Sequence, residues 1–516
     1  MTAATRLLCL LAAALLLSLP AAYNGLPFIY PDTATYIRGA EMGVQKLVGA
    51  ERLPAWVPDE RATKAPASAA GQPLSPAVDT DDIKAQGSVS SVADKVVLAG
   101  RSVYYGMLLY VSFLAGSLWL TVLVHGLCAA YVLHVLMVRL WGLRERTFLG
   151  TVAALTLLTP LGVFTGFLMP DIFTGLVILC TGTLTVYWTR LSRPSRWMLG
   201  AILLFGLASH ASHLPLAAAL LLLAWGARRF AHRPIATPAL AVVAGCLVAA
   251  LAAEAAFNLA VTRFVGAPPL RLPHLTARLI DMGPGTDYLR SRCPTERWAA
   301  CRFVANYPTR WDAFLFSPEP SKGAFALADS ATKRRMSEEQ LGLAWAVFRH
   351  APVTVARGVA QDVVRQVFLF DVDVAGSGTD HLPMFVGRMP DRLIEDMRAM
   401  RFFDTHAAHE FWSATTYAST FAAVVLLAVF ARRRVPLQSP GEASSQAFTT
   451  FTLLVLAGVL LNAVLCATLA SPLERFQSRV IWLVPWIGMT WLALAWQHGA
   501  LRRIKKAPVA APLSIS

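Results

Sequence analysis

The segment Tyr30-Pro31-Asp32-Thr33-Ala34-Thr35-Tyr36 carries the clearest signal for chemistry, because it follows the first apolar run directly. A carboxylate at a membrane edge is partly desolvated, and desolvation raises its affinity for a proton. Such a group is suited to take a proton from a sugar or lipid hydroxyl as a general base. The alternative is that Asp32 only caps a helix beginning near Thr33. We therefore predict either a base or a cap at Asp32.

A second carboxylate, Asp171, lies in the turn Met169-Pro170-Asp171 between two apolar runs. Placing an ionised aspartate deeper in a bilayer costs about 2.5 to 3.5 kcal/mol, so an acid here needs a function or a capping role at the helix starting near Ile172. Two acids on one side of a bundle could share a divalent cation with phosphate oxygens, or act as base and orienting group. We predict Asp32 and Asp171 as catalytic residues, with a metal as an open alternative.

A basic turn near the C-terminus is a candidate phosphate site. It runs from Ser471 to Arg479 and contains Glu474 and Arg475. Arg475 and Arg479 are four residues apart, so on a helix they share a face and could hold a phosphate by forked hydrogen bonds. Contact with lipid headgroups is the alternative.

Further polar candidates lie at the same level of the chain. His210 and His213 are three residues apart and would face one way on a helix, as cavity lining, as structural histidines or as zinc ligands. Tyr104 and Tyr105 are predicted to belong to an interfacial aromatic belt or to an acceptor-binding surface.

The elements that must position these residues are apolar helices. Hydrophobic residues make up 56% of the chain and charged residues 15%, and apolar runs of about 20 residues recur. This predicts an all-α polytopic membrane protein with about ten transmembrane helices. The first run is predicted to be an anchor, with a cleaved signal peptide as the alternative. The predicted spans are 7–22, 119–140, 148–168, 172–189, 197–208, 214–227, 238–261, 411–431, 448–470 and 480–497.

Two features of this pattern suggest departures from simple crossings. The spans on either side of His210 are short, which indicates a thinned or protein-lined region. The apolar stretch 102–117 is predicted to be re-entrant or interfacial.

Arginine clusters occupy every second turn, whereas acids, histidines and long polar segments occupy the others. The positive-inside bias places the arginine turns, and both termini, in the cytoplasm and the chemistry on the extracytoplasmic face. It also accounts for the net charge of +15, so nucleic-acid binding is not expected. The excess of Arg over Lys, with abundant Ala and Leu, favours a bacterial inner (cytoplasmic) membrane. The clusters are Arg139, Arg144 and Arg146; Arg190, Arg193 and Arg196; Arg228, Arg229 and Arg233; Arg432 to Arg434; and Arg502, Arg503, Lys505 and Lys506.

Three parts are predicted along the chain. Residues 1–261 form a membrane module whose first extracytoplasmic loop, 23–101, includes a mobile linker at 54–91. Residues 262–410 form an extracytoplasmic domain, and residues 411–516 form C-terminal helices and a basic tail. Apolar spacing at Leu341, Ala344, Trp345 and Phe348 predicts helices in the middle part.

The cysteines fall into two groups, one in the polar segment and one in the apolar runs. Cys293 and Cys301 lie close together in the polar segment and predict a disulfide, with two free thiols as the alternative. The remaining cysteines lie in apolar runs and are predicted to act as small hydrophobic residues; they are Cys9, Cys128, Cys180, Cys246 and Cys466.

The layout resembles the GT-C glycosyltransferases, which use sugars linked to polyprenyl phosphate. The shared features are an Asp in the first extracytoplasmic loop, an acid ahead of a helix in the next loop, many spans and a late soluble segment. The turn at Glu474 and Arg475 is similar to the Glu-Arg-aromatic turn of many such enzymes. The resemblance implies that Asp32 is the general base and Asp171 a substrate or metal contact. This chain lacks the paired acids that some branches carry in the first loop, because Pro31 and Thr33 flank Asp32.

By this resemblance the protein transfers a sugar from a polyprenyl-phosphate donor to an envelope glycan, lipid or protein acceptor. A divalent cation is the one cofactor considered, and membrane lipids are expected partners. The first alternative is a secondary transporter, which needs polar elements near the bilayer midplane and pseudo-symmetric halves. The second is a non-enzymatic envelope assembly protein, in which the 262–410 domain binds a partner.

Overall fold

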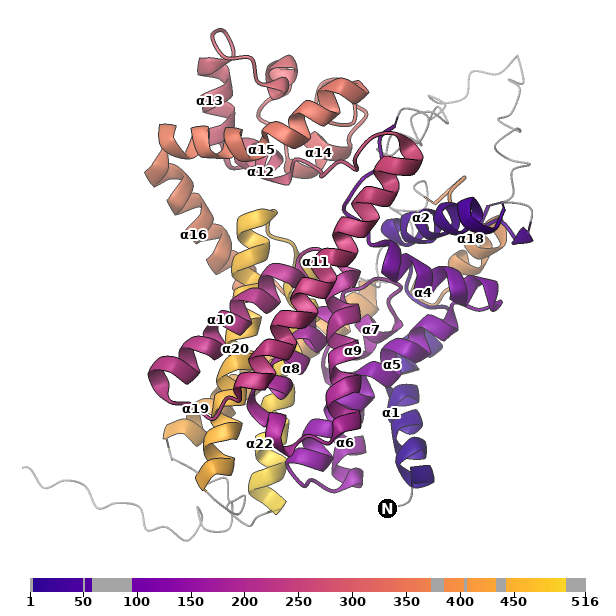
Figure 1. The fold of residues 1–516 in the computed structure, drawn as a ribbon, viewed down its shortest axis with the longest axis vertical. Helices are drawn as coiled ribbons and strands as arrows, with labels where there is room; N and C mark the ends of the chain where they lie inside the picture. Colours follow the sequence, from indigo (N-terminus) through magenta and orange to yellow (C-terminus); the bar gives the residue numbers. More distant parts are fainter. Residues whose placement is uncertain are drawn as a thin grey trace, which may run out of the picture.

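The computed structural model describes residues 3–49, 52–57, 95–372, 385–402, 406–432 and 442–497. Within these residues regular structure is helical, and strand-like pairing is confined to two isolated bridges. Eight of the described helices are long and apolar enough to cross a membrane. The protein is therefore an all-α polytopic membrane protein, as its composition predicts (Figure 1).

Eight of the ten predicted spans correspond to these long helices. They are α1 (Ala3–Asn24), α5 (Trp119–His134) with its π-helical continuation η3 (Val135–Leu140), α8 (Ile172–Tyr187) with η4 (Trp188–Arg190), α10 (His213–Ala231), α11 (Thr237–Val265), α19 (His406–Arg432), α20 (Glu442–Leu469), and the pair α21 (Glu474–Ile481) and α22 (Leu483–Gln497).

The two remaining predicted spans are helical but shorter. The segment 148–168 is divided into α6 (Glu145–Leu158) and α7 (Leu161–Gly166), because Pro160 lacks the N–H that would continue the first helix. The segment 197–208 is α9 (Arg193–Ser209), of 17 residues. The prediction that 214–227 is also short is wrong, since α10 has 19 residues and is long enough to cross.

Helix α1 is an integral part of the bundle and packs on α5, α6 and α7. Small residues allow this close approach. A Cβ at Gly126 would lie 3.0 Å from the carbonyl oxygen of Ala14, and one at Gly166 would lie 2.6 Å from Cβ of Ala21. Such contacts between small residues are the usual source of helix association in membranes.

The predicted interfacial stretch 102–117 contains a short apolar helix, α4 (Val103–Leu114), which packs against α2 (Pro31–Val48). Both lie across the bundle (Figure 1). A Cβ at Gly106 would lie 2.3 Å from the carbonyl oxygen of Tyr36, so only glycine allows the two helices to come this close.

The start of the predicted mobile linker is fixed in the structure. Trp56 is buried, its backbone N–H donates to Glu41 Oε1 at 2.6 Å, and its indole N–H donates to the Arg388 carbonyl at 2.8 Å. The prediction of mobility is therefore wrong for residues 54–57. Residues 58–91 lie outside the described part of the chain.

A polar helical unit lies at the end of the molecule opposite the N-terminus (Figure 1). Its core includes Leu289, Phe314, Phe325 and Val347. It comprises α12 (His274–Met282), α13 (Pro284–Arg292), η5 (Ala299–Asn306), α14 (Trp311–Phe316), α15 (Ser330–His350) and α16 (Pro352–Phe368).

The boundaries of this unit differ from the predicted 262–410. Helix α11 continues to Val265, and α19 already begins at His406. Residues near α18 (Asp391–Arg398), including Phe385 and Met397, belong to the hydrophobic core of the membrane bundle. The later part of the predicted domain therefore packs with the membrane bundle and does not belong to the polar unit.

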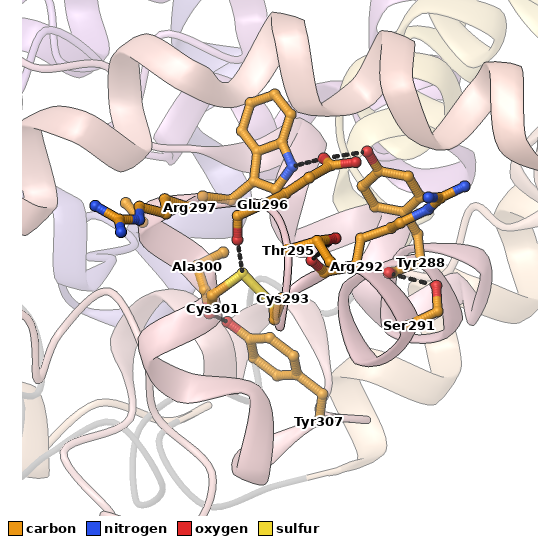
Figure 2. The surroundings of a disulfide bond; sticks show 12 residues. Tyr288, Ser291, Arg292, Cys293, Thr295, Glu296, Arg297, Ala300, Cys301 and Tyr307 are labelled. Carbon is orange, nitrogen blue, oxygen red and sulfur yellow. Dashed lines mark hydrogen bonds between the residues drawn. A yellow bond between two sulfur atoms is a disulfide. The ribbon is translucent and has the colours of Figure 1, made fainter.

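Cys293 and Cys301 form the predicted disulfide, at the edge of the polar unit's core (Figure 2). Beside it, the Glu296 carboxylate accepts hydrogen bonds from the Tyr288 hydroxyl at 2.6 Å and the Trp298 indole at 2.7 Å. The Tyr307 hydroxyl donates to the Ala300 carbonyl at 2.9 Å. The disulfide therefore closes a loop whose polar groups are already paired.

Replacing Cys293 with Ser should destabilise the polar unit by about 2 to 3 kcal/mol, since a short closed loop no longer restricts the unfolded chain. Denaturant unfolding of the full chain under non-reducing conditions measures this. Cys128→Ser, a thiol on α5, is the matched control and should leave the unfolding free energy of the polar unit unchanged. Alkylation of both Cys293 and Cys301 in untreated native protein would contradict the disulfide.

Candidate active site

Backbone hydrogen bonds join the segment before α2 to the segment before α8. The N–H of Phe28 donates to the Gly166 carbonyl, and the N–H of Leu168 donates to the Phe28 carbonyl, both at 2.9 Å. The Thr33 hydroxyl donates to the Leu168 carbonyl at 3.1 Å. The first turns of α2 and α8, which carry the two predicted acids, are therefore held together.

Asp32 is the second residue of α2 and does not cap it. Instead the Thr33 hydroxyl accepts the backbone N–H of Tyr30 at 3.1 Å. The Asp32 carboxylate accepts a hydrogen bond from Arg101 Nε at 3.2 Å and a second one from Nη2 of the same guanidinium. About 25% of its side chain is exposed. The capping alternative for Asp32 is wrong, and the carboxylate remains accessible beside a cation.

The proton affinity of Asp32 is lower than the sequence suggests. Burial is the largest single influence and raises the pKa of this carboxyl, but the charge and hydrogen bonds of Arg101 lower it, and together with the charges of Arg475 and Arg388 they outweigh burial. The net shift is downward, so the predicted increase in proton affinity is wrong. The physical reason is the nearby guanidinium, which desolvation arguments alone do not include.

Arg101 is fixed by the start of α4. The hydroxyl of Ser102, its neighbour, accepts the Tyr104 N–H at 3.1 Å and donates to the Ala208 carbonyl at 2.5 Å. The N-cap thus ties α4 to the end of α9, and the guanidinium one residue earlier is held over α2.

Asp171 is almost completely buried, with 2% of its side chain exposed. Its carboxylate lies 3.5 Å from Arg475 Nε and 3.6 Å from Arg479 Nη1. It makes no capping hydrogen bond to α8, so the capping alternative is wrong here also. Arg475 and Arg479 share one face of α21, as their spacing predicts, and Asp171 holds both guanidiniums.

Arg475 connects the two acids. It interacts electrostatically with Asp171 and Asp32, and its Cζ lies 4.4 Å from the centroid of the Tyr30 ring. The three residues that the sequence singles out most strongly, Asp32, Asp171 and Arg475, therefore belong to one site.

This site has more positive than negative charge. Four guanidiniums, those of Arg101, Arg388, Arg475 and Arg479, surround two carboxylates, which leaves an excess of two positive charges. Within the described residues, Nε and Nη1 of Arg475 and Nε of Arg479 are buried without a hydrogen-bond partner. Buried polar groups are normally paired. The arrangement therefore suits an anion with several acceptor oxygens.

His213 is a structural residue. Its Nδ1 donates to the Gly206 carbonyl at 2.6 Å, so its Nε2 accepts the Thr174 hydroxyl at 2.8 Å. Both ring nitrogens are used, which removes His213 as a zinc ligand. Among the described residues, Asp32 and Asp171 also belong to no group of three or more side chains close enough to hold a metal ion.

His210 lies beside the arginines. Burial lowers its pKa to about 3, and the charges of Arg479 and Arg475 act in the same direction. Its Nδ1 accepts the Ser212 N–H at 3.2 Å. His210 is therefore a neutral residue beside the arginines, and its role as cavity lining stays a prediction.

The two tyrosines have different environments. Tyr105 is fully buried against Tyr36 and His125, so neither the belt nor the acceptor-surface prediction holds for it. The Tyr104 hydroxyl donates to the Ala253 carbonyl at 2.8 Å, and its side chain lines a pocket beside Arg101.

Glu474, the acid of the predicted basic turn, lies at the start of α21, close to Tyr417 of α19.

Sequence reasoning missed Arg101 and Arg388 as parts of the site. In the sequence Arg101 is only the last residue of the predicted loop 23–101. Arg388 lies in a polar segment that contains no local motif.

Comparison with known protein families, curated proteins and solved structures finds no match to this chain.

Replacing Asp171 with Asn should destabilise the bundle by about 3 to 5 kcal/mol, because two buried guanidiniums lose their counter-charge. Asp32→Asn is the matched control and should cost less, since Asp32 and Arg101 are both partly exposed. Thermal unfolding of the detergent-solubilised chain, followed by size-exclusion chromatography, compares them. Equal losses would contradict a structural role for the Asp171 cluster.

Proposed function

We propose that this protein transfers a sugar from a polyprenyl-phosphate donor to an acceptor hydroxyl on the extracytoplasmic face of a bacterial inner membrane. The observation that carries the proposal is a site with two excess positive charges, unpaired arginine donors and one accessible carboxylate. An anionic donor and a nucleophilic hydroxyl both have a counterpart there. The acceptor would be an envelope glycan, lipid or protein.

The arginines account for the phosphate of the donor. Within the described residues Nε and Nη1 of Arg475 make no hydrogen bond, although Nε lies 3.5 Å from the Asp171 carboxylate. Guanidiniums bind phosphate through paired, charge-assisted hydrogen bonds. In the proposed reaction the bond between the sugar's anomeric carbon and the phosphate oxygen breaks. The negative charge that develops on the leaving phosphate is stabilised by groups already in place.

The pocket beside Arg101 accounts for the lipid. It lies between α4, α9, α10 and α11, and its walls include Leu207, Leu214 and Phe257. Arg101 and Tyr104 line the same pocket. Apolar walls beside a cation suit a molecule with a hydrocarbon chain and an anionic head.

Asp32 is the proposed general base. In the structure Arg101 lowers its pKa, which makes it a weak base. A donor phosphate that draws Arg101 away removes this counter-charge, and burial then raises the pKa of the carboxyl. The acceptor hydroxyl transfers its proton to Asp32 as its oxygen attacks the anomeric carbon, so the base gains strength only when the donor is bound.

Asp32→Asn should reduce sugar transfer about 100- to 10,000-fold, because the positioned base is lost. The assay uses membranes containing the protein, a labelled polyprenyl-phosphate sugar and quantification of labelled product. Asp287→Asn, at an exposed acid of α13, is the matched control and should retain activity. Full activity of a folded Asp32→Asn protein would exclude Asp32 as the base.

Arg101→Gln should move the acidic limb of the pH profile for kcat/KM to higher pH. In the wild type the pKa of Asp32 lies below its ordinary value of 3.8, so the base stays ionised down to acidic pH. Without the guanidinium, burial dominates and protonation removes the base at higher pH. An acidic limb that stays in place, or moves to lower pH, would contradict the coupling of Arg101 to Asp32.

A further inference from the structure

A second polar cluster lies far from the candidate active site, where three helices of the bundle meet. Its members are Cys9 of α1, His134 at the end of α5 and Glu145 at the start of α6. The thiol sulfur, one imidazole nitrogen and one carboxylate oxygen all lie within 4.8 Å of one another. His134 Nε2 and Glu145 Oε1 are 3.9 Å apart. These are three different kinds of metal ligand at one point.

The cluster is largely enclosed, with Glu145 as its most exposed member at 23% of its side chain. His134 is 4% exposed and Cys9 8% exposed. Within the described residues, His134 Nε2 and Glu145 Oε1 are both buried without a hydrogen-bond partner. The His134 ring is also held edge-on to Phe148, with ring centroids 5.3 Å apart. Such unpaired atoms are costly unless a ligand satisfies them.

The backbone at this point is also unusual. The chain changes from α-helix to π-helix directly after His134, and η3 continues to Leu140. Short π-helical stretches are rare in proteins and occur often at functional sites. The wider turn begins at the residue that offers the nitrogen ligand.

We propose that Cys9, His134 and Glu145 bind one zinc ion. Zinc takes thiolate, imidazole and carboxylate ligands at about 2.0 to 2.3 Å, which places ligand atoms about 3.3 to 3.6 Å apart in a tetrahedral site. The distance of 3.9 Å between His134 Nε2 and Glu145 Oε1 is close to this range, and the other spacings, of at most 4.8 Å, exceed it by up to about 1.5 Å, so side-chain rotations close the site. The fourth position would hold water or another donor.

Charge and compartment fit this ion. The positive-inside bias places this end of the bundle toward the cytoplasm, where thiols stay reduced. Binding transfers the Cys9 thiol proton to solvent, and the thiolate and carboxylate together balance the two charges of the ion. Arg6 and Arg139 lie near His134, so cations are close to the Glu145 carboxylate in the metal-free protein.

A metal here would fasten α1 to α5 and α6. Helix α1 leads into the segment that is paired with the residues before α8, and α2 with Asp32 follows. The zinc ion would therefore stabilise the N-terminal helix that supports the first acid of the candidate active site. This role does not depend on what reaction that site performs.

The test uses the full chain without a polyhistidine tag, purified in detergent under reducing conditions and titrated with Co²⁺. Cobalt replaces zinc and gives absorption bands that report thiolate coordination and tetrahedral geometry. The wild type should bind one Co²⁺ per chain and show the thiolate band, and Zn²⁺ should displace it.

Two variants and one control give the decisive comparison. Loss of groups that merely support metal ligands costs about 10- to 100-fold in affinity, so Cys9→Ser should weaken Co²⁺ binding by about 100-fold or more and abolish the thiolate band. His134→Gln should weaken binding similarly but leave the thiol chemically reactive. Cys246→Ser, at another thiol of an apolar helix, should bind like the wild type.

Failure to bind Co²⁺ in the folded wild type would overturn the proposal. A thiolate band that persists in Cys9→Ser would also overturn it, because the metal would then lie on another cysteine. Both results are read from metal binding, so neither depends on an activity assay or on whether the protein transfers a sugar.

Discussion

The ion cluster of Asp171, Arg475 and Arg479 is the constraint on which the rest of the site depends. Removing charged groups from water costs several kcal/mol per ion, so a carboxylate and two guanidiniums this deeply buried must remain together. The helices that carry these residues, α8 and α21, also pack closely against each other. The Trp482 indole donates to the Arg479 carbonyl at 3.0 Å, and a Cβ at Gly175 would lie 2.7 Å from that indole. The junction of α21 and α22 can therefore approach α8 only because residue 175 is glycine.

This cluster also determines how the two acids differ. Asp171 has its negative charge matched by two guanidiniums in an enclosed setting, whereas Asp32 shares one guanidinium and is partly open. The Asp171 carboxylate lies 3.5 Å from Arg475 Nε and 3.6 Å from Arg479 Nη1, and its effect is to hold these two arginines in place. The sequence predicts two catalytic acids, with Asp32 as general base and Asp171 as a substrate or metal contact, and the packing gives them unequal environments. The accessible one is the group that a substrate could reach.

The fold could be predicted from the sequence more fully than the site. Apolar run lengths and arginine turns identified the positions of the helices, because these signals are local and the bilayer imposes them. The proline break at Pro160 and the length of α10 were missed, since helix ends depend on neighbouring helices. Helical spacing correctly predicted α15, yet Leu341 and Trp345 are largely exposed, so periodicity identified a helix without its buried face. The role of Arg101 in the site could not be predicted, because nothing in its own segment indicates that it lies over Asp32.

The unequal acids and the excess of positive charge fit together as one mechanism. A site with four guanidiniums and two carboxylates attracts an anion, and its guanidiniums lower the pKa of Asp32. A phosphate ligand changes this balance, since it adds negative charge beside the same guanidiniums that lower the pKa of Asp32. In the proposed reaction, base strength would then follow occupancy by the donor, and an empty site would not remove protons from water or from acceptors. Asp171 differs in position, because it is enclosed between Arg475 and Arg479 with 2% of its side chain exposed. The division between a structural acid and an accessible acid therefore follows from exposure together with the guanidiniums that each carboxylate faces.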